Sequence, residues 1–205
     1  MKRKSNAVIT FIKKHPITFR LSRVFYPNDF ERMLFVIKAY IKNNNNSFKN
    51  VLHVEQSRTG SRLVATDGLR LHYAEISRKI KSGNYKPIVT KDFIYFGLPI
   101  ENIKFPEWSK IIPEETKQKG VINLEETGLK KDRKLNERLS LAFNDFIQNT
   151  GEPINLRYLE DLTKRKWSIH CQNGKKKAFY LKEDRAKLGK LNEPFAVIMP
   201  IPQVA

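Results

Sequence analysis

The spacing of hydrophobic residues changes from strand-like to helical within the first 41 positions. Apolar stretches at Ala7–Ile12 and Ile17–Leu21 are rich in β-branched and aromatic residues and are separated by a proline, so we predict two strands. Asn28 is a candidate N-cap, with Glu31 three positions later. Apolar residues then recur at helical spacing at Phe30, Met33, Leu34, Ile37 and Ile41, before an asparagine run that ends the predicted helix.

A hairpin is predicted around Asp67-Gly68, a dipeptide that favours two-residue turns. Strands are expected before it at Val51–Gln56 and Arg62–Thr66, and after it at Leu69–Ile76. In the last strand, apolar and polar positions alternate, which predicts a sheet with one buried face. The inward set is Leu69, Leu71 and Tyr73, and the outward set is Arg70, His72 and Ala74.

The second half of the chain repeats the order of helix followed by strands. An amphipathic helix is predicted at Leu129–Gln148 and a shorter one at Asn155–Thr163, with Leu156, Leu159 and Leu162 facing inward. An Asn173-Gly174 turn joins two of the closing strands. Strands are expected at Ile88–Phe96, Trp167–Cys171, Ala178–Lys182 and Phe195–Ile201, and an extended connector at Phe105–Pro113.

The charge of the chain points to a polyanionic partner. The 205 residues include 39 Lys and Arg against 21 Asp and Glu, a formal net charge of +18. Counterion release makes nucleic acid the preferred partner. A membrane is not expected, because no apolar run approaches the roughly 20 residues needed to span one. The single cysteine, Cys171, is predicted to be a buried small side chain in a reducing, cytoplasmic compartment.

The sequence offers no recognisable catalytic or cofactor motif. The four histidines lack metal-ligand spacing, Cys171 lacks zinc-ligand partners, and there is no glycine-rich phosphate loop. Nothing in the spacing of the acidic residues favours a metal-dependent nuclease; these are Asp67, Glu75, Asp92, Glu101 and Glu107. We therefore expect no enzyme activity, no metal and no cofactor.

Three short strings, in this order, carry a family resemblance. They are Ala65–Leu71 (ATDGLRL), Phe105–Pro113 (FPEWSKIIP) and Ala196–Ile201 (AVIMPI). Together they resemble the bacterial sliding clamp, the DNA polymerase III beta subunit family. In that family an ATDGHRL hairpin, an FPDYRRVIP connector and a terminal VVMPM strand build a pocket that binds peptides of polymerases.

The resemblance implies an α+β, DNA-clamp-like fold of antiparallel sheets with paired helices, built from two strand-helix-strands halves. A complete clamp subunit has three domains, more than 205 residues can supply. We expect one clamp-like domain, with a first half at 1–100, a connector and inserted helical segment at 101–154, and a second half at 155–205. Two trimmed domains are the alternative. The compact size is associated with phage or mobile-element proteins.

The resemblance also implies site residues. The partner-peptide pocket would comprise Thr66, Gly68, Leu69, Arg70, Leu71, Pro106, Ile111, Val197, Met199, Pro200 and Ile201. Two positions depart from the family pattern: Leu69 replaces the hairpin histidine, and Pro202 stands at the position of a terminal basic residue. Helix faces lining a channel would contact the phosphates of duplex DNA without sequence specificity. The candidates are Lys38, Lys42, Arg157, Lys164, Arg165 and Lys166.

These inferences predict a non-catalytic processivity factor that binds duplex DNA and recruits a replication polymerase or other clamp-binding peptides. A ring would be a homo-oligomer, of six copies if the chain is one domain and of three if it is two. The alternative is a clamp fold that does not encircle DNA and acts as a DNA-binding or regulatory module. Arg138–Phe143 resembles a degenerate clamp-binding hexapeptide that could dock on a host clamp, although ordinary core leucines of an amphipathic helix are the preferred explanation.

Overall fold

The computed structural model describes residues 16–41, 47–112, 117–124, 133–162, 166–171, 178–183 and 194–200. The chain forms two compact units. The N-terminal unit comprises Met1–Asp67 and Ala74–Pro106, and the C-terminal unit comprises Gly68–Tyr73 and Glu107–Ala205. The predicted strand at Ala7–Ile12 and the predicted turn at Asn173-Gly174 lie outside the described residues.

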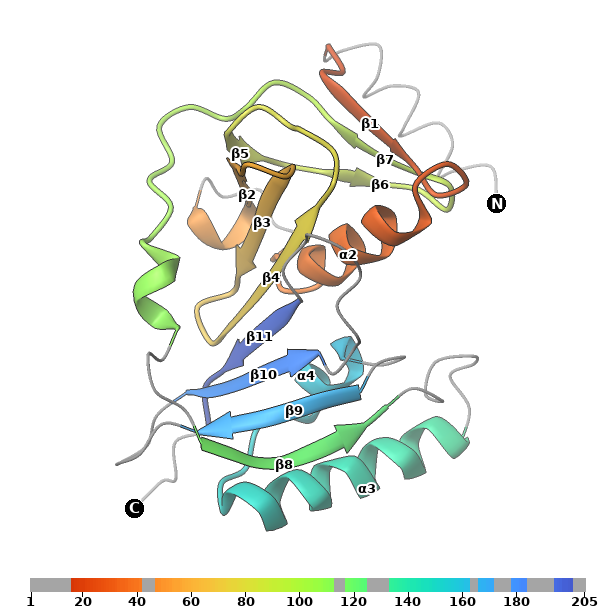
Figure 1. Cartoon of the computed structure of the whole chain (residues 1–205), viewed down its shortest axis with the longest axis vertical. Coiled ribbons are helices and arrows are strands. Elements are labelled where there is room, and N and C mark those ends of the chain that lie inside the picture. Colours follow the sequence, from red (N-terminus) through yellow and green to blue (C-terminus); the bar gives the residue numbers. More distant parts are fainter. Residues whose placement is uncertain are drawn as a thin grey trace. The chain divides into compact units, whose positions relative to one another are not determined.

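Two antiparallel sheets and one long helix build the N-terminal unit (Figure 1). In the first sheet, β7 (Phe93–Phe96) pairs with both β1 (Phe19–Ser22) and β6 (Ile88–Val89). In the second, β2 (Leu52–Gln56) pairs with β3 (Ser61–Thr66) and with β5 (Gly83–Tyr85). A 3-10 helix, η1 (Phe48–Asn50), precedes β2.

Helix α2 (Pro27–Ile37) differs from the prediction at both ends. It begins at Pro27, whose fixed φ suits the first turn, so Asn28 is not its N-cap. It does not reach Ile41, because tighter i−3 hydrogen bonds, such as Lys38 N to Phe35 O at 3.3 Å, close its last turn. The amide of Ile41 donates instead to the carbonyl of Lys49, at 2.8 Å.

Strand β4 (Arg70–Ile76) begins in the C-terminal unit and ends in the N-terminal unit. The predicted alternation is wrong here. Every residue from Leu71 to Ile76 is buried, including His72, while Leu69 precedes the strand and is 59% exposed. Burial on both faces removes the period-two pattern that a half-solvated strand would show. At the far end of the strand, Glu75 pairs with Arg62 of β3 at 3.1 Å.

Four more strands follow the start of β4 in the C-terminal unit. In order they are β11 (Phe195–Ile198), β10 (Phe179–Glu183), β9 (Lys166–Cys171) and β8 (Lys117–Asn123), each antiparallel to its neighbour. Strand β8 was not predicted, because its residues are mostly polar and a register shift interrupts it between Gln118 and Gly120.

The described residues of the C-terminal unit also form two α-helices, α3 (Arg133–Thr150) and α4 (Leu156–Asp161). Helix α3 runs beside β8 in Figure 1. Phe146 of α3 contacts Phe179 of β10 edge to face, with ring centres 4.8 Å apart. The α4 prediction was right in place and wrong in one detail: Leu159 and Leu162 are buried, but Leu156 is 39% exposed. Indole Nε1 of Trp167 donates to the carbonyl of Leu162 at 2.8 Å, which ties the end of α4 to β9.

The α+β class with antiparallel strands is confirmed. The division into one clamp-like domain, or into two trimmed ones, stays a prediction. In the part of the chain that the structure describes, no helix is long and apolar enough to cross a membrane.

Candidate partner-binding site

The hairpin string and the terminal string meet through strand pairing in the C-terminal unit. Leu71 lies opposite Val197 and Arg70 opposite Ile198 in the β4–β11 register. The pairing extends one step beyond the strands, because the amide of Met199 donates to the carbonyl of Leu69 at 2.9 Å. Residues 126 or more positions apart in the sequence are thus held side by side.

The paired ends of these strands expose two apolar side chains. Leu69 is 59% exposed and Met199 is 40% exposed, whereas Leu71 and Val197 are each 2% exposed. Gly68 has φ 93°, a value that an L-residue adopts only with strain, and so allows the chain to turn into β4. Leu69 and Met199 can therefore contact an apolar side chain of a ligand, next to Leu71 and Val197, which are already packed in the core.

Arg70 links the strand pair to α4. Its guanidinium carbon lies 4.7 Å from the centre of the Tyr158 ring, and it forms an ion pair with Asp161. Asn155 caps the helix by accepting a hydrogen bond from the amide of Arg157 at 3.0 Å. Sequence reasoning missed Tyr158 and Asp161, although their spacing of three places them on one helix face, where they could have been recognised as partners of a cation.

The connector string reaches the same strand pair through Trp108. The Trp108 ring lies 5.2 Å from that of Tyr73, which stacks on Phe195 at 4.4 Å. The predicted extended conformation is wrong here, because Trp108–Ile111 forms a 3-10 helix, η2, with Lys110 N donating to Glu107 O at 3.2 Å. Ile111, at the end of η2, is 42% exposed.

The remaining residues of the predicted pocket are distributed differently. Thr66 is buried and Pro106 half-buried, and both belong to the N-terminal unit. Pro200 is half-buried directly after Met199 in the C-terminal unit, and Ile201 lies outside the described residues. The structure therefore brings Leu69, Arg70 and Leu71 together with Val197 and Met199, and the complete pocket stays a prediction.

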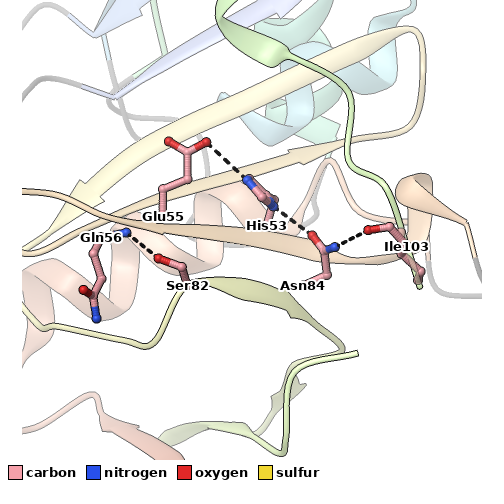
Figure 2. Close-up of polar contacts among 6 residues, drawn as sticks. All are labelled: His53, Glu55, Gln56, Ser82, Asn84 and Ile103. Carbon is pink, nitrogen blue, oxygen red and sulfur yellow. Dashed lines mark hydrogen bonds and ion pairs between the residues drawn. The ribbon is translucent and has the colours of Figure 1, made fainter. Parts of the chain in front are cut away.

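The beginning of the connector is anchored inside the N-terminal unit, as Figure 2 shows. Asn84 Oδ1 accepts a hydrogen bond from His53 Nδ1 at 2.8 Å, and Asn84 Nδ2 donates to the carbonyl of Ile103 at 2.7 Å. The other ring nitrogen of His53 lies 3.2 Å from a carboxylate oxygen of Glu55. Phe105 stacks on His53 with ring centres 4.6 Å apart, so the connector leaves this unit from a fixed position.

The predicted DNA contacts lie in both units. Lys38 is exposed at the C-terminal end of α2 in the N-terminal unit. In the C-terminal unit, Arg157 is exposed on α4 and Lys166 is half-buried at the start of β9. Lys42, Lys164 and Arg165 lie outside the described residues, and a common channel lined by these cations stays a prediction.

The reactive side chains have ordinary surroundings. Cys171 is half-buried at the end of β9, less buried than predicted, and burial raises the pKa of its thiol, which opposes thiolate chemistry. Burial, with a smaller effect from nearby Lys182, lowers the pKa of His170. Within the described ranges, no group of three or more His, Cys, Asp or Glu residues could hold a metal ion.

Comparison with solved structures identifies the fold. No protein-family profile and no curated protein sequence matches this chain. The DNA polymerase III beta subunit of Thermotoga maritima matches with a TM-score of 0.56 and 16% identity, over 93% of this chain and 66% of that one. A sliding clamp of Pseudomonas aeruginosa matches with a TM-score of 0.59 and 13% identity, over 92% of this chain and 67% of that one. A sliding clamp of Bacillus subtilis matches with a TM-score of 0.58 and 10% identity, over 93% of this chain and 65% of that one. The chain thus has a fold similar to that of sliding clamps and spans about two thirds of their length.

Proposed function

We propose that this chain is a non-catalytic, clamp-like DNA replication factor that docks partner peptides on the β4–β11 pair and binds duplex DNA without sequence specificity. The observation that carries the proposal is the register of Leu71 with Val197, continued by the Met199–Leu69 hydrogen bond. It joins two of the three strings behind the family resemblance, within a fold similar to that of sliding clamps.

The ligand that fits best is an extended peptide with Leu or Phe anchors. Leu69 and Met199 supply exposed apolar contacts, and Met adapts its shape to different side chains. Two of the solved clamps, from Pseudomonas aeruginosa and Bartonella birtlesii, are bound to griselimycin. Griselimycin is therefore a suitable competitor for the proposed site.

Fluorescence anisotropy with a labelled peptide containing Leu and Phe anchors tests the site. We expect saturable binding that griselimycin competes away, and at least tenfold weaker binding after the double substitution Leu69→Asp and Met199→Asp. Leu98→Asp is the matched control, because Leu98 is 61% exposed in the other unit. Peptide binding that survives the double substitution would refute the docking site.

Duplex binding is tested separately, by titrating duplexes of different sequence at several salt concentrations. We expect similar affinity for all of them and a steep salt dependence, since each neutralised phosphate contributes a slope of about −0.9. Arg157→Gln and Lys38→Gln should each reduce the slope by about 1, whereas Lys104→Gln, at an exposed position just before the connector, should not. Unchanged slopes for both variants would remove these residues from the DNA-binding face.

The proposal also includes a closed ring of several copies around DNA. Sedimentation gives the number of copies, and retention on circular DNA that ends when the DNA is cut would demonstrate encirclement. A monomer that is released equally from circular and linear DNA would contradict a ring and leave the peptide-docking test unaffected.

One observation favours a second function, docking on another clamp. Leu141 is 63% exposed on α3, within the Arg138–Phe143 segment, whereas Leu139 is buried as part of the core. A pull-down with a purified bacterial sliding clamp tests this alternative. Capture that is lost after Leu141→Ala and Phe143→Ala would support it, and absence of capture would eliminate it.

A further inference from the structure

Among the described residues of the N-terminal unit, the turn between β1 and α2 carries the most solvent-accessible large hydrophobic side chains. Val24 is 77% exposed and Phe25 is 78% exposed, followed by Tyr26 at 37%. We call Arg23–Tyr26 the aromatic tip. Neither the core nor the proposed peptide site uses these side chains, because the peptide site lies in the C-terminal unit. Val24 and Phe25 therefore contribute little to packing, and both side chains are accessible to a ligand.

Two arginines are held in place at the aromatic tip: Arg23 belongs to it, and Arg78 comes from the segment after β4. Arg23 pairs with Glu31 at 2.7 Å, and its guanidinium carbon lies 5.5 Å from the centre of the Phe30 ring. Arg78 donates a hydrogen bond to the hydroxyl of Tyr26 at 3.1 Å, and its guanidinium carbon lies 4.5 Å from the centre of that ring. Because the contacts with Tyr26 hold the Arg78 side chain, little conformational entropy is lost when this guanidinium binds a ligand.

The charges around the aromatic tip suit an anionic ligand. Asp29 is buried and accepts two hydrogen bonds from Ser77, at 3.0 and 2.6 Å, and Glu31 is already paired with Arg23. Arg78, Lys79 and Lys91 are exposed in the adjoining segments, beside one exposed acid, Asp92. The amide of Arg23 donates to the carbonyl of Asp92 at 2.9 Å, which places Lys91 and Asp92 near the end of β1.

We propose that the aromatic tip binds single-stranded nucleic acid, with an unpaired base stacked on Phe25 and a flanking phosphate bound by Arg78. Every base offers a ring face, so such stacking tolerates any sequence, and arginine adds both charge and a planar group. A paired base cannot present its face to Phe25, and the tip should therefore distinguish a single strand from a duplex. This site is separate from the peptide site and does not depend on ring formation.

Fluorescence anisotropy with labelled dT20 tests the proposal on the full chain. We expect Phe25→Ala to weaken dT20 binding by at least about fivefold, the low end of what one stacked base contributes. Phe25→Trp should retain affinity, and the emission of the new indole should be quenched by dT20. Arg78→Gln should reduce the salt dependence of binding by about one counterion.

Two controls separate stacking from folding and from general charge. Leu98→Ala removes another exposed apolar side chain, beyond the opposite end of the β1–β7 pair, and should leave dT20 affinity unchanged. Thermal unfolding should be the same for Phe25→Ala and the parent chain, because the ring is mostly in solvent. A 20-base-pair duplex should bind Phe25→Ala and the parent chain equally.

Three outcomes would overturn the proposal. The first is no measurable binding of dT20, or binding that Phe25→Ala does not change. The second is an equal loss of dT20 and duplex affinity in Phe25→Ala. The third is a tip that binds polyglutamate or phosphatidylserine vesicles through Phe25 while dT20 binding is unaffected, which would assign it to an acidic protein or to a membrane surface.

Discussion

Arg70 and Tyr158 contact each other across the C-terminal unit, with 4.7 Å between the guanidinium carbon and the ring centre. The first belongs to β4 and the second to α4, and Asp161 on the same helix pairs with the guanidinium. One side chain of the hairpin string is thus anchored by a helix that none of the three strings contains.

We predict that Asp161→Asn lowers the free energy of unfolding by about 1–3 kcal/mol, because the Arg70 side chain is only 14% exposed and loses its charged partner. Urea denaturation measures the change, with Asp145→Asn at an exposed position of α3 as the control. Asp161→Asn should also weaken peptide binding. Equal stability of both variants would mean that the ion pair does not anchor the hairpin.

The anchor of the connector on His53 gives a second prediction. His53→Ala removes the ring that stacks on Phe105 and the donor to Asn84, and should cost about 1–2 kcal/mol of unfolding free energy. Hydrogen exchange should accelerate at the amide of Ile100, which bonds to the carbonyl of Asn84 at 2.7 Å. His53→Phe keeps a ring and should recover part of the loss. Unchanged exchange in His53→Ala would show that the connector is held elsewhere.

Two glycines should respond differently to the same substitution. A Cβ at Gly60 would lie 2.0 Å from the carbonyl oxygen of Ile76, a backbone atom that cannot move alone. A Cβ at Gly120 would meet the end of the exposed Asn149 side chain, which can rotate away. Gly60→Ala should therefore cost about 1–3 kcal/mol or more, and Gly120→Ala much less, in thermal or urea unfolding. The reverse order would contradict the close approach at Gly60.

The lowered pKa of His170 predicts that this residue makes the folded chain less stable in acid. Burial, and then Lys182, lower its pKa in the folded chain, so the unfolded chain binds a proton first as the pH falls. Stability should therefore decrease as the pH drops through the unfolded value near 6.5 and should not change through this group above it. Urea midpoints at pH 7.5 and 5.5 should differ less for His170→Gln than for the parent chain. Lys182→Met should raise the pKa of His170, as an NMR titration of the ring would measure; a titration at or above 6.5 in the parent chain would contradict both expectations.

Local patterns were sufficient to predict most elements of the fold. The helical spacing of Phe30, Met33 and Ile37, and the turn at Gly68, gave α2 and the β3–β4 hairpin nearly in place. The predicted ends of α2 were wrong for two reasons. Pro27 starts the helix without a side-chain cap, and the amide of Ile41 donates to the carbonyl of Lys49 rather than to its own helix. Such choices depend on distant partners, which spacing does not encode.

The candidate site was predictable only in part. The strings containing Leu71 and Val197 were assigned to one predicted site, and β4 and β11 do pair at these residues, while the binding site itself stays a prediction. Tyr158 and Asp161 were missed because their importance depends on a contact with Arg70, 91 positions away from Asp161 in the sequence. Strand β8 was missed because Lys117 and Lys119 give it the composition of a loop.

The path of β4 has a practical consequence. Because Gly68–Tyr73 belongs to one unit and Ala74–Ile76 to the other, no single cut of the polypeptide yields two intact pieces. A truncation beginning at Glu107 would keep β11 and leave it without the neighbour that covers Val197 and Ile198. In such a fragment β11 would still pair with β10 but would expose its other, apolar edge, and the fragment should self-associate in solution. Tests of the proposed peptide site and of the proposed nucleic-acid sites therefore call for point substitutions in the intact chain.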